Sequence, residues 1–114
     1  MPFISTKTTV SIDEAKEKIL KEKLGKAIEL LPGKTEAWLM LSFEDNVKMY
    51  FKGDNSAPCA YVEVNIFGKA SSAAYDAMTA AVCDIFHTEL DIPSDRIYVK
   101  YEECDHWGWN GSTF

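Results

Sequence analysis

Pro2 is the residue of this chain that most directly offers a reactive group. Methionine aminopeptidases normally remove a start methionine that precedes a small residue, and Pro2 would then carry a free secondary amine. A free α-amino group has a pKa of about 7.7–8.0, and burial or nearby cations lower that pKa by disfavouring the charged form. Pro2 is therefore a candidate general base. The alternative is that Pro2-Phe3-Ile4 only begins an edge strand, and a retained Met1 would make the proline nitrogen an amide.

The composition is that of a globular protein, with 46% hydrophobic and 26% charged residues. A length of 114 residues predicts one domain, spanning residues 1–114, with a modest core. The net charge of −6 and a single arginine argue against nucleic-acid binding, which needs clustered cations. No apolar run approaches the roughly 20 residues that span a bilayer, and the first 20 residues lack the layout of a signal peptide. We therefore expect a cytoplasmic protein without membrane insertion.

The cysteine and histidine residues do not show the spacing of a metal site. Cys59, Cys83 and Cys104 are odd in number and widely separated, and neither they nor His87 and His106 form a C-x-x-C or H-x-x-x-H pair. We therefore expect no metal and no disulfide framework.

Hydrophobic periodicity predicts a strand, a helix and a second strand in the first half of the chain. Residues 3–8 alternate and are rich in threonine, as in a strand. Ser11 and Glu14 match a capping box before a helix whose apolar stripe runs over residues 12–31. Residues 37–43 are apolar at both parities, which predicts a strand covered on both faces.

The second half of the chain repeats this order. Residues 60–67 form a strand, a serine at position 71 or 72 caps a helix, and residues 97–101 form a further strand. Residues 47–51 are interpreted as a short strand or extended arm, and the tail 106–114 is aromatic but interrupted by glycines.

Two βαβ halves of this kind join most simply into one α+β domain. Each crossover should be right-handed, giving a four-stranded mixed sheet with two helices on one face. The strands at 37–43 and 60–67 carry apolar residues on both faces, so the face without helices should be buried against another copy of the chain. The pattern therefore predicts an oligomer but not its symmetry.

Short motifs spread over the whole chain suggest a family. These are Pro2-Phe3-Ile4, Pro32-Gly33-Lys34-Thr35, Pro58-Cys59-Ala60, Phe67-Gly68-Lys69, Pro93-Ser94-Asp95-Arg96-Ile97-Tyr98 and Trp109-Asn110-Gly111-Ser112-Thr113-Phe114. With them the chain resembles the macrophage migration inhibitory factor family of the tautomerase superfamily.

The resemblance implies a homotrimer whose sheets surround a central channel. It also implies keto–enol tautomerase activity, without a cofactor, on aromatic 2-oxo acids such as phenylpyruvate and on dopachrome-like compounds. The alternative that it implies is a cytokine-like signalling protein with a vestigial pocket, released without a signal peptide and recognised by a cell-surface receptor if it is secreted.

The same resemblance assigns roles to individual residues. Pro2 matches the catalytic base, and Lys34 matches the lysine that binds the substrate carboxylate and would depress the Pro2 pKa. The backbone N–H of Phe67 matches a second carboxylate contact, and Tyr98 matches a tyrosine contributed by the neighbouring subunit. The family's pocket has apolar wall positions that would exclude water and stack on an aromatic ring. The residues that match or neighbour these positions are Phe3, Trp38, Trp107, Trp109 and Phe114.

The chain departs from the family pattern at three places. Lys100 replaces the asparagine of vertebrate members and adds a second cation near the mouth of the pocket, which would either improve the binding of acidic substrates or change which substrates fit. The family's C-x-x-C is reduced to Cys59-Ala60-Tyr61-Val62, so thiol–disulfide chemistry through that motif is not expected. The bulky Phe67 and Trp107 would narrow the pocket.

Overall fold

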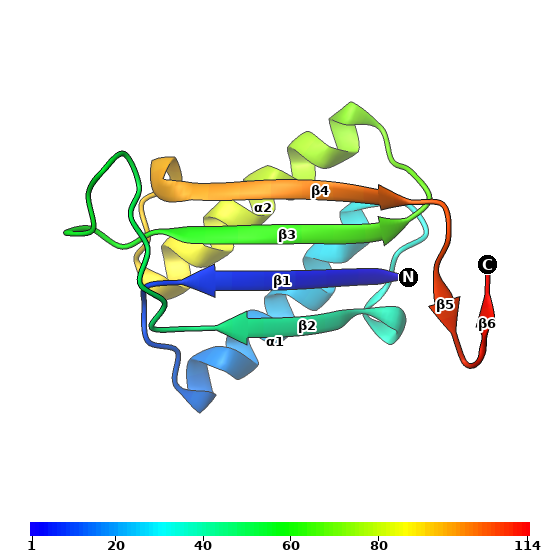
Figure 1. The fold of residues 1–114 in the computed structure, drawn as a ribbon, viewed down its shortest axis with the longest axis horizontal. Helices are drawn as coiled ribbons and strands as arrows, with labels where there is room; N and C mark the ends of the chain where they lie inside the picture. The colour runs from blue at the N-terminus through cyan, green and yellow to red at the C-terminus, as the bar shows by residue number, and fades with distance from the viewer.

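The computed structural model describes residues Met1 to Phe114. It confirms the predicted α+β fold, in which two helices cover one face of a four-stranded mixed sheet (Figure 1). The elements are β1 (Pro2–Thr8), α1 (Glu14–Ala27), η1 (Ile28–Leu30), η2 (Glu36–Trp38), β2 (Met40–Glu44), β3 (Ala60–Phe67), α2 (Ser72–Leu90), η3 (Ser94–Arg96), β4 (Ile97–Cys104), β5 (Gly108–Trp109) and β6 (Ser112–Thr113), where η marks a 3-10 turn.

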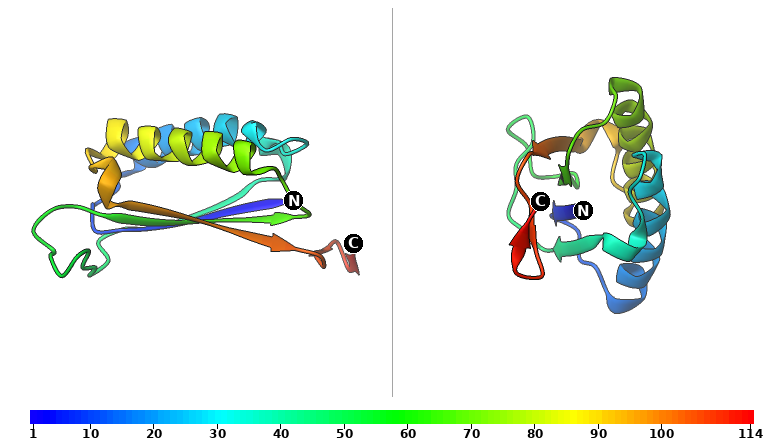
Figure 2. Two further views of the ribbon diagram at one scale, coloured as in Figure 1. Left: turned by 90° about the horizontal axis from the view of Figure 1, so that it is seen from above. Right: turned by 90° about the vertical axis from the view of Figure 1, so that its right-hand side faces the viewer.

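The strand order β2-β1-β3-β4 joins the two βαβ halves at their first strands. Strands β1 and β2 are parallel, as are β3 and β4, whereas the central pair β1 and β3 is antiparallel. The two helices lie side by side over the sheet (Figure 2). Because of the antiparallel central pair, the first residues of β1 and β2 lie at the same end of the sheet as the last residues of β3 and β4.

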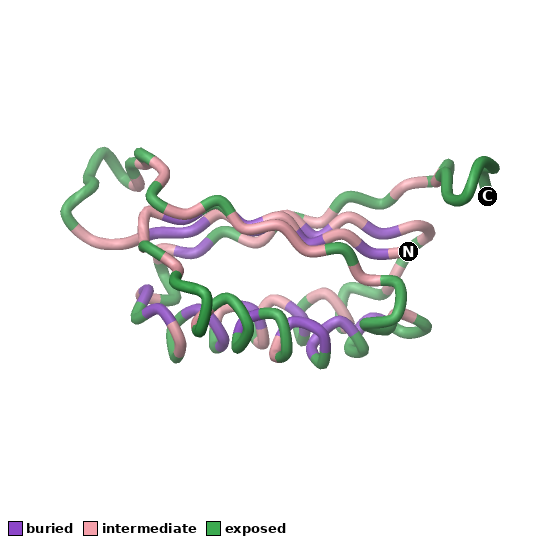
Figure 3. The backbone as a smooth tube through the Cα atoms, turned by 90° about the horizontal axis from the view of Figure 1, so that it is seen from below, coloured by how far each residue is buried: buried purple, intermediate pink, exposed green.

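The core lies between the sheet and the helices. Buried segments occur in both the sheet layer and the helix layer (Figure 3). Buried and partly exposed positions alternate along β3, as period-2 strand geometry requires. The largest fully buried side chains include Ile4 and Ile66 from the sheet and Leu20, Met78 and Phe86 from the helices.

The sheet face without helices is open in the single chain. On β3 it carries Tyr61, Glu63, Asn65 and Phe67, all partly exposed. This face is therefore mixed in polarity rather than apolar, and its burial in an oligomer stays a prediction.

The first helix begins later than the capping-box prediction. Asp13, not Ser11, is the N-cap, and its Oδ1 accepts a hydrogen bond of 2.8 Å from the Lys16 backbone N–H. The Ile12 N–H donates instead to Asp45 Oδ2 at 2.8 Å, which holds this segment outside the helix. An aspartate caps as well as a serine does, so the two were not separable by residue type.

The predicted strand over 37–43 was wrong at its start. Residues Glu36–Trp38 form the 3-10 turn η2, and β2 begins at Met40. Residues 47–51 form no strand apart from an isolated bridge between Phe51 and Asp54. Strand β4 extends to Cys104, beyond the predicted end at 101.

Thr6 places an unpaired hydroxyl in the core. Its side chain is fully buried, and Oγ1 has no hydrogen-bond partner. Two residues on, the Thr8 hydroxyl donates to the Cys59 carbonyl at 2.9 Å and accepts from the Val10 N–H at 3.2 Å. The two threonines therefore form a matched pair, one unsatisfied and one satisfied.

We expect Thr6→Val to raise the free energy of unfolding by about 1–2 kcal/mol, because the isosteric methyl removes an uncompensated polar group. Thr8→Val should lower it by about 1–3 kcal/mol, because it leaves the Val10 N–H without its partner and removes one of the two hydrogen bonds to the Cys59 carbonyl, which keeps only the Thr9 N–H at 3.3 Å. Urea unfolding of the two variants measures both effects. Equal losses in the two variants would contradict the assignment of Thr6 as unpaired.

Candidate active site

A cavity of about 480 Å³ lies at the Pro2 end of the sheet. Its walls come from the start of β1, from η2 and the start of β2, and from the C-terminal tail. The residues that line it are Met1, Pro2, Phe3, Ala37, Trp38, Leu39, Met40, Trp107, Gly108 and Trp109. Three of them are tryptophans and most are apolar, which is the lining expected of a small-molecule site for an aromatic ring.

Strand pairing places Pro2 at this cavity. Pro2 is opposite Ile66 on β3, and Phe3 is opposite Met40 on β2. Pro2 is buried, while Phe3 is partly exposed. The candidate base therefore sits at the end of a central strand, where β3 pairs with Pro2 itself and β2 pairs with the next residue, Phe3.

A tight turn brings Lys34 to the same end of the sheet. Gly33 has φ +81°, a conformation that favours glycine, and the turn after η1 is closed by the Lys34 N–H donating to Leu31 O at 3.0 Å. The Lys34 ammonium then donates to the Phe67 carbonyl at 2.8 Å. Lys34 is thereby tied to the last residue of β3.

Burial and Lys34 both act on the terminal amine in this corner. Burial lowers the pKa of the Met1 α-amino group below its ordinary value, and the positive charge of Lys34 lowers it further. With Met1 attached, the Pro2 nitrogen is an amide. After loss of Met1 the terminal amine belongs to Pro2, a more buried residue of the same corner, so both effects should lower its pKa as well.

Met1 also accepts the hydrogen bond of a backbone N–H that a substrate could otherwise use. The Phe67 backbone N–H donates to the Met1 carbonyl at 3.1 Å. This is the N–H that the sequence resemblance assigns to a substrate carboxylate. Loss of Met1 would therefore release two groups at once, the proline nitrogen and the Phe67 donor, a link that sequence reasoning missed.

The tryptophans of the cavity, Trp38, Trp107 and Trp109, form an aromatic wall. This wall is held together by a C-terminal hairpin, which was not predicted. Strands β5 and β6 pair antiparallel across Asn110 and Gly111, both with positive φ. The Asn-Gly dipeptide is a strong hairpin signal that could have predicted it. The hairpin places Trp109 edge-to-face on Trp38, with ring centroids 5.0 Å apart, and a second tilted pair joins Phe67 and Phe114 at 5.6 Å.

Tyr98 and Lys100 do not lie in this cavity. Pro2 pairs with Ile66 of β3, and Ile66 pairs with Glu103 of β4, so Pro2 and Glu103 lie at the same level of the sheet. Tyr98 is five residues from Glu103 along the strand, about 17 Å at roughly 3.3 Å per residue. Within one chain Tyr98 therefore cannot join Pro2, and Lys100 is not among the residues that line the cavity.

Lys100 is also paired with an acidic neighbour on the open sheet face. Its ammonium lies 2.8 Å from Glu102 Oε1, and this hydrogen bond raises the Lys100 pKa above its ordinary value. On the adjacent strand its partner in register is Glu63. The second cation of the sequence is therefore balanced by carboxylates before any ligand is present.

No cluster of three or more His, Cys, Asp or Glu side chains has a metal-binding arrangement in this structure. No helix combines the length and the hydropathy that crossing a bilayer requires.

The sheet consists of two βαβ units, its central strand β1 begins with Pro2, and the aromatic cavity lies at that residue. This fold and site place the chain in the tautomerase superfamily. Within that superfamily, the chain belongs to the macrophage migration inhibitory factor (MIF) family, whose family model matches residues 1–114. MIF proteins commonly have tautomerase activity and typically form trimers.

Individual relatives agree over the full length. The macrophage migration inhibitory factor of Xenopus laevis is 31% identical over 116 residues, which cover 100% of this chain and 99% of the relative. The crystal structure of Leishmania major MIF2 is 36% identical and superposes with a TM-score of 0.92, covering 100% of this chain and 97% of that one. The homologue from Prochlorococcus marinus is 37% identical with a TM-score of 0.86, covering 98% of each chain.

Proposed function

We propose that this protein is a cofactor-free keto–enol tautomerase that acts on aromatic 2-oxo acids such as phenylpyruvate and on dopachrome-like compounds. The observation that carries the proposal is the position of Pro2 in an aromatic cavity, at a corner where burial and Lys34 lower the pKa of a terminal amine. An amine that is neutral near pH 7 can accept a proton from carbon, and its conjugate acid can return it.

The net reaction moves one proton from carbon to oxygen and shifts two electron pairs. The neutral Pro2 nitrogen takes a proton from the carbon next to the substrate's keto group, the electrons of that C–H bond form the C=C bond, and the carbonyl electron pair moves onto oxygen. Protonation of that oxygen gives the enol, and the reverse sequence gives the keto acid. Lys34 and the freed Phe67 N–H would hold the substrate carboxylate, and the positive charge would also stabilise the enolate.

The aromatic wall would orient the ring of the substrate. Trp38 and Trp109 already form an edge-to-face pair, and Trp107 lines the same cavity. A phenyl group bound among these rings would be shielded from water, which strengthens the interaction of the carboxylate with Lys34. Phe3 would extend the wall from β1, and Phe114 would support it through its contact with Phe67.

A homotrimer would supply the residues that one chain cannot. The separation of about 17 Å along β4 at roughly 3.3 Å per residue means that Tyr98 can reach a Pro2 cavity only from a neighbouring subunit. The open sheet face gives that neighbour a surface to pack on. In this assembly Tyr98 would orient the substrate, and Lys100 would add positive charge once a ligand competes with Glu102.

The proposal is tested on untagged, purified protein. Intact mass spectrometry should show loss of Met1, and an ultraviolet assay of phenylpyruvate should show enol–keto conversion above the buffer rate. Protein made with methionine aminopeptidase inhibited is the matched control and should be inactive. A folded, trimeric protein that lacks Met1 and does not convert phenylpyruvate or a dopachrome ester would overturn the proposal in favour of a cytokine-like binding role.

A further inference from the structure

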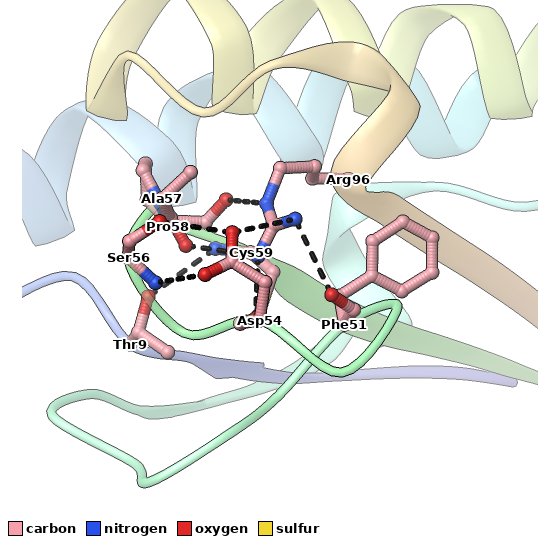
Figure 4. A network of polar contacts seen from close by, with 8 residues as sticks. All are labelled: Thr9, Phe51, Asp54, Ser56, Ala57, Pro58, Cys59 and Arg96. Atoms are coloured by element: carbon pink, nitrogen blue, oxygen red, sulfur yellow. Dashed lines mark hydrogen bonds and ion pairs between the residues drawn. The ribbon is translucent and has the colours of Figure 1, made fainter.

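Arg96, the only arginine of the chain, fastens loop 51–58 to the start of β4 (Figure 4). Its Nε donates to Pro58 O at 3.0 Å, and one terminal nitrogen donates to both Asp54 O and Ala57 O at 3.0 Å. The other terminal nitrogen donates to Phe51 O at 3.4 Å. The Arg96 side chain is only 12% exposed. Because the guanidinium donates hydrogen bonds to four backbone carbonyls of this loop, it fixes the conformation of the loop relative to β4.

The same guanidinium holds the ring of Phe51. Its central carbon lies 5.4 Å from the ring centroid, within cation–π range. The Phe51 backbone is fixed as well, because its N–H and carbonyl both pair with Asp54, at 2.9 and 3.0 Å. Phe51 is therefore restrained at both its main chain and its side chain.

Phe51 in turn contacts Tyr98. The two rings are edge-to-face, with centroids 5.1 Å apart and planes at 84°. Tyr98 is otherwise little supported, because its residue is 63% exposed and its hydroxyl makes no hydrogen bond within the chain. The orientation of the Tyr98 ring is therefore set by Phe51 rather than by a polar partner.

We propose that Phe51, held by Arg96, is a positioning residue that orients Tyr98 for the substrate cavity of a neighbouring subunit. This inference rests on the proposed function, since it assumes that Tyr98 contacts substrate. A ring held in place before binding loses less conformational freedom when the substrate arrives. Arg96 and Phe51 thus act on the reaction only through Tyr98.

The test compares Phe51→Leu with Tyr50→Leu, a neighbouring aromatic that is 71% exposed and makes no ring pair with Tyr98. Phe51→Leu should lower kcat/KM about three- to tenfold, the factor that corresponds to loss of an edge-to-face aromatic pair. Tyr50→Leu should leave it unchanged. In a Tyr98→Ala background, Phe51→Leu should have no further effect, because nothing remains to be oriented.

A second measurement does not depend on activity. The aromatic ¹³C–¹H signal of Tyr98, assigned through its loss in Tyr98→Ala, should shift in Phe51→Leu and not in Tyr50→Leu, while melting temperature and oligomeric state stay the same. An unchanged signal would overturn the positioning role even if the wild-type enzyme is active. An equal loss of kcat/KM with and without the Tyr98 side chain would overturn it too. A signal that shifts in a catalytically silent wild-type protein would support the contact while the proposed tautomerase function failed.

Discussion

Replacing Pro2 by glycine should lower kcat for phenylpyruvate tautomerisation by about two to four orders of magnitude, the usual contribution of a positioned general base. Methionine before glycine is also removed, so the variant keeps a terminal amine but loses the ring that fixes its direction. Pro2 is buried at the start of β1, between β2 and β3. A glycine amine there would be both more mobile and more hydrated, and therefore more often protonated or misdirected.

The control for Pro2→Gly is the state of the protein rather than another substitution. The variant should keep its oligomeric state and its N-terminal processing, as seen by light scattering and intact mass. Full activity in a processed glycine variant would contradict the expected loss and show that catalysis does not depend on the proline ring. Loss of activity together with loss of the oligomer would point to folding instead of chemistry.

Replacing Lys34 by methionine should lower kcat/KM by about 10- to 150-fold, mainly through KM. A hydrogen bond to a charged group contributes about 1.5–3 kcal/mol, which corresponds to that range. Methionine keeps most of the length and volume of lysine and removes the ammonium that lies 2.8 Å from Phe67 O. The matched control is Lys69→Met, an exposed lysine two residues beyond Phe67 that makes no ion pair.

The pH profile separates the two roles given to Lys34. The base works when it is neutral, so activity rises as pH rises through its pKa. Lys34 lowers the pKa of the terminal amine in this corner, and its removal should therefore move the rise in activity to higher pH. A higher KM with an unshifted profile would limit Lys34 to carboxylate binding, and an unchanged KM would contradict that binding role.

The fold was predictable because its main signals are periodic. Burial alternates along β3 at the spacing that the sequence shows, and the stripe on the second helix contains the buried Met78 and Phe86. The order of elements then limited the topology to two right-handed crossovers. The predicted boundaries were wrong where more than one local structure suits the same residue types. Asp13 caps the first helix instead of Ser11, and Ala37 and Trp38 lie in a 3-10 turn although both residues suit a strand.

The candidate site was predictable only in part. Pro2 could be identified from its position after the start methionine, whereas the roles of Lys34 and Tyr98 came from the family resemblance. The structure places Lys34 at the end of β3 and Tyr98 near the start of the parallel strand β4, so the two residues lie at opposite ends of this strand pair. The occupation of the Phe67 N–H by Met1 could not be read from the sequence, because it depends on a long-range backbone contact. The support of Tyr98 by Phe51 depends likewise on a loop whose shape is set by one arginine.

Both chain ends lie at the same end of the sheet (Figure 1). Phe114 packs 5.6 Å from the Phe67 ring, and its N–H donates to Trp107 O at 2.9 Å. An affinity tag fused to either terminus would therefore emerge beside the cavity, and an N-terminal one would also convert the proline amine into an amide. Kinetic work on this protein calls for a scarless, untagged chain, and surface attachment is better made through Lys18, an exposed lysine in the first half of α1, away from the end of the sheet that carries the cavity.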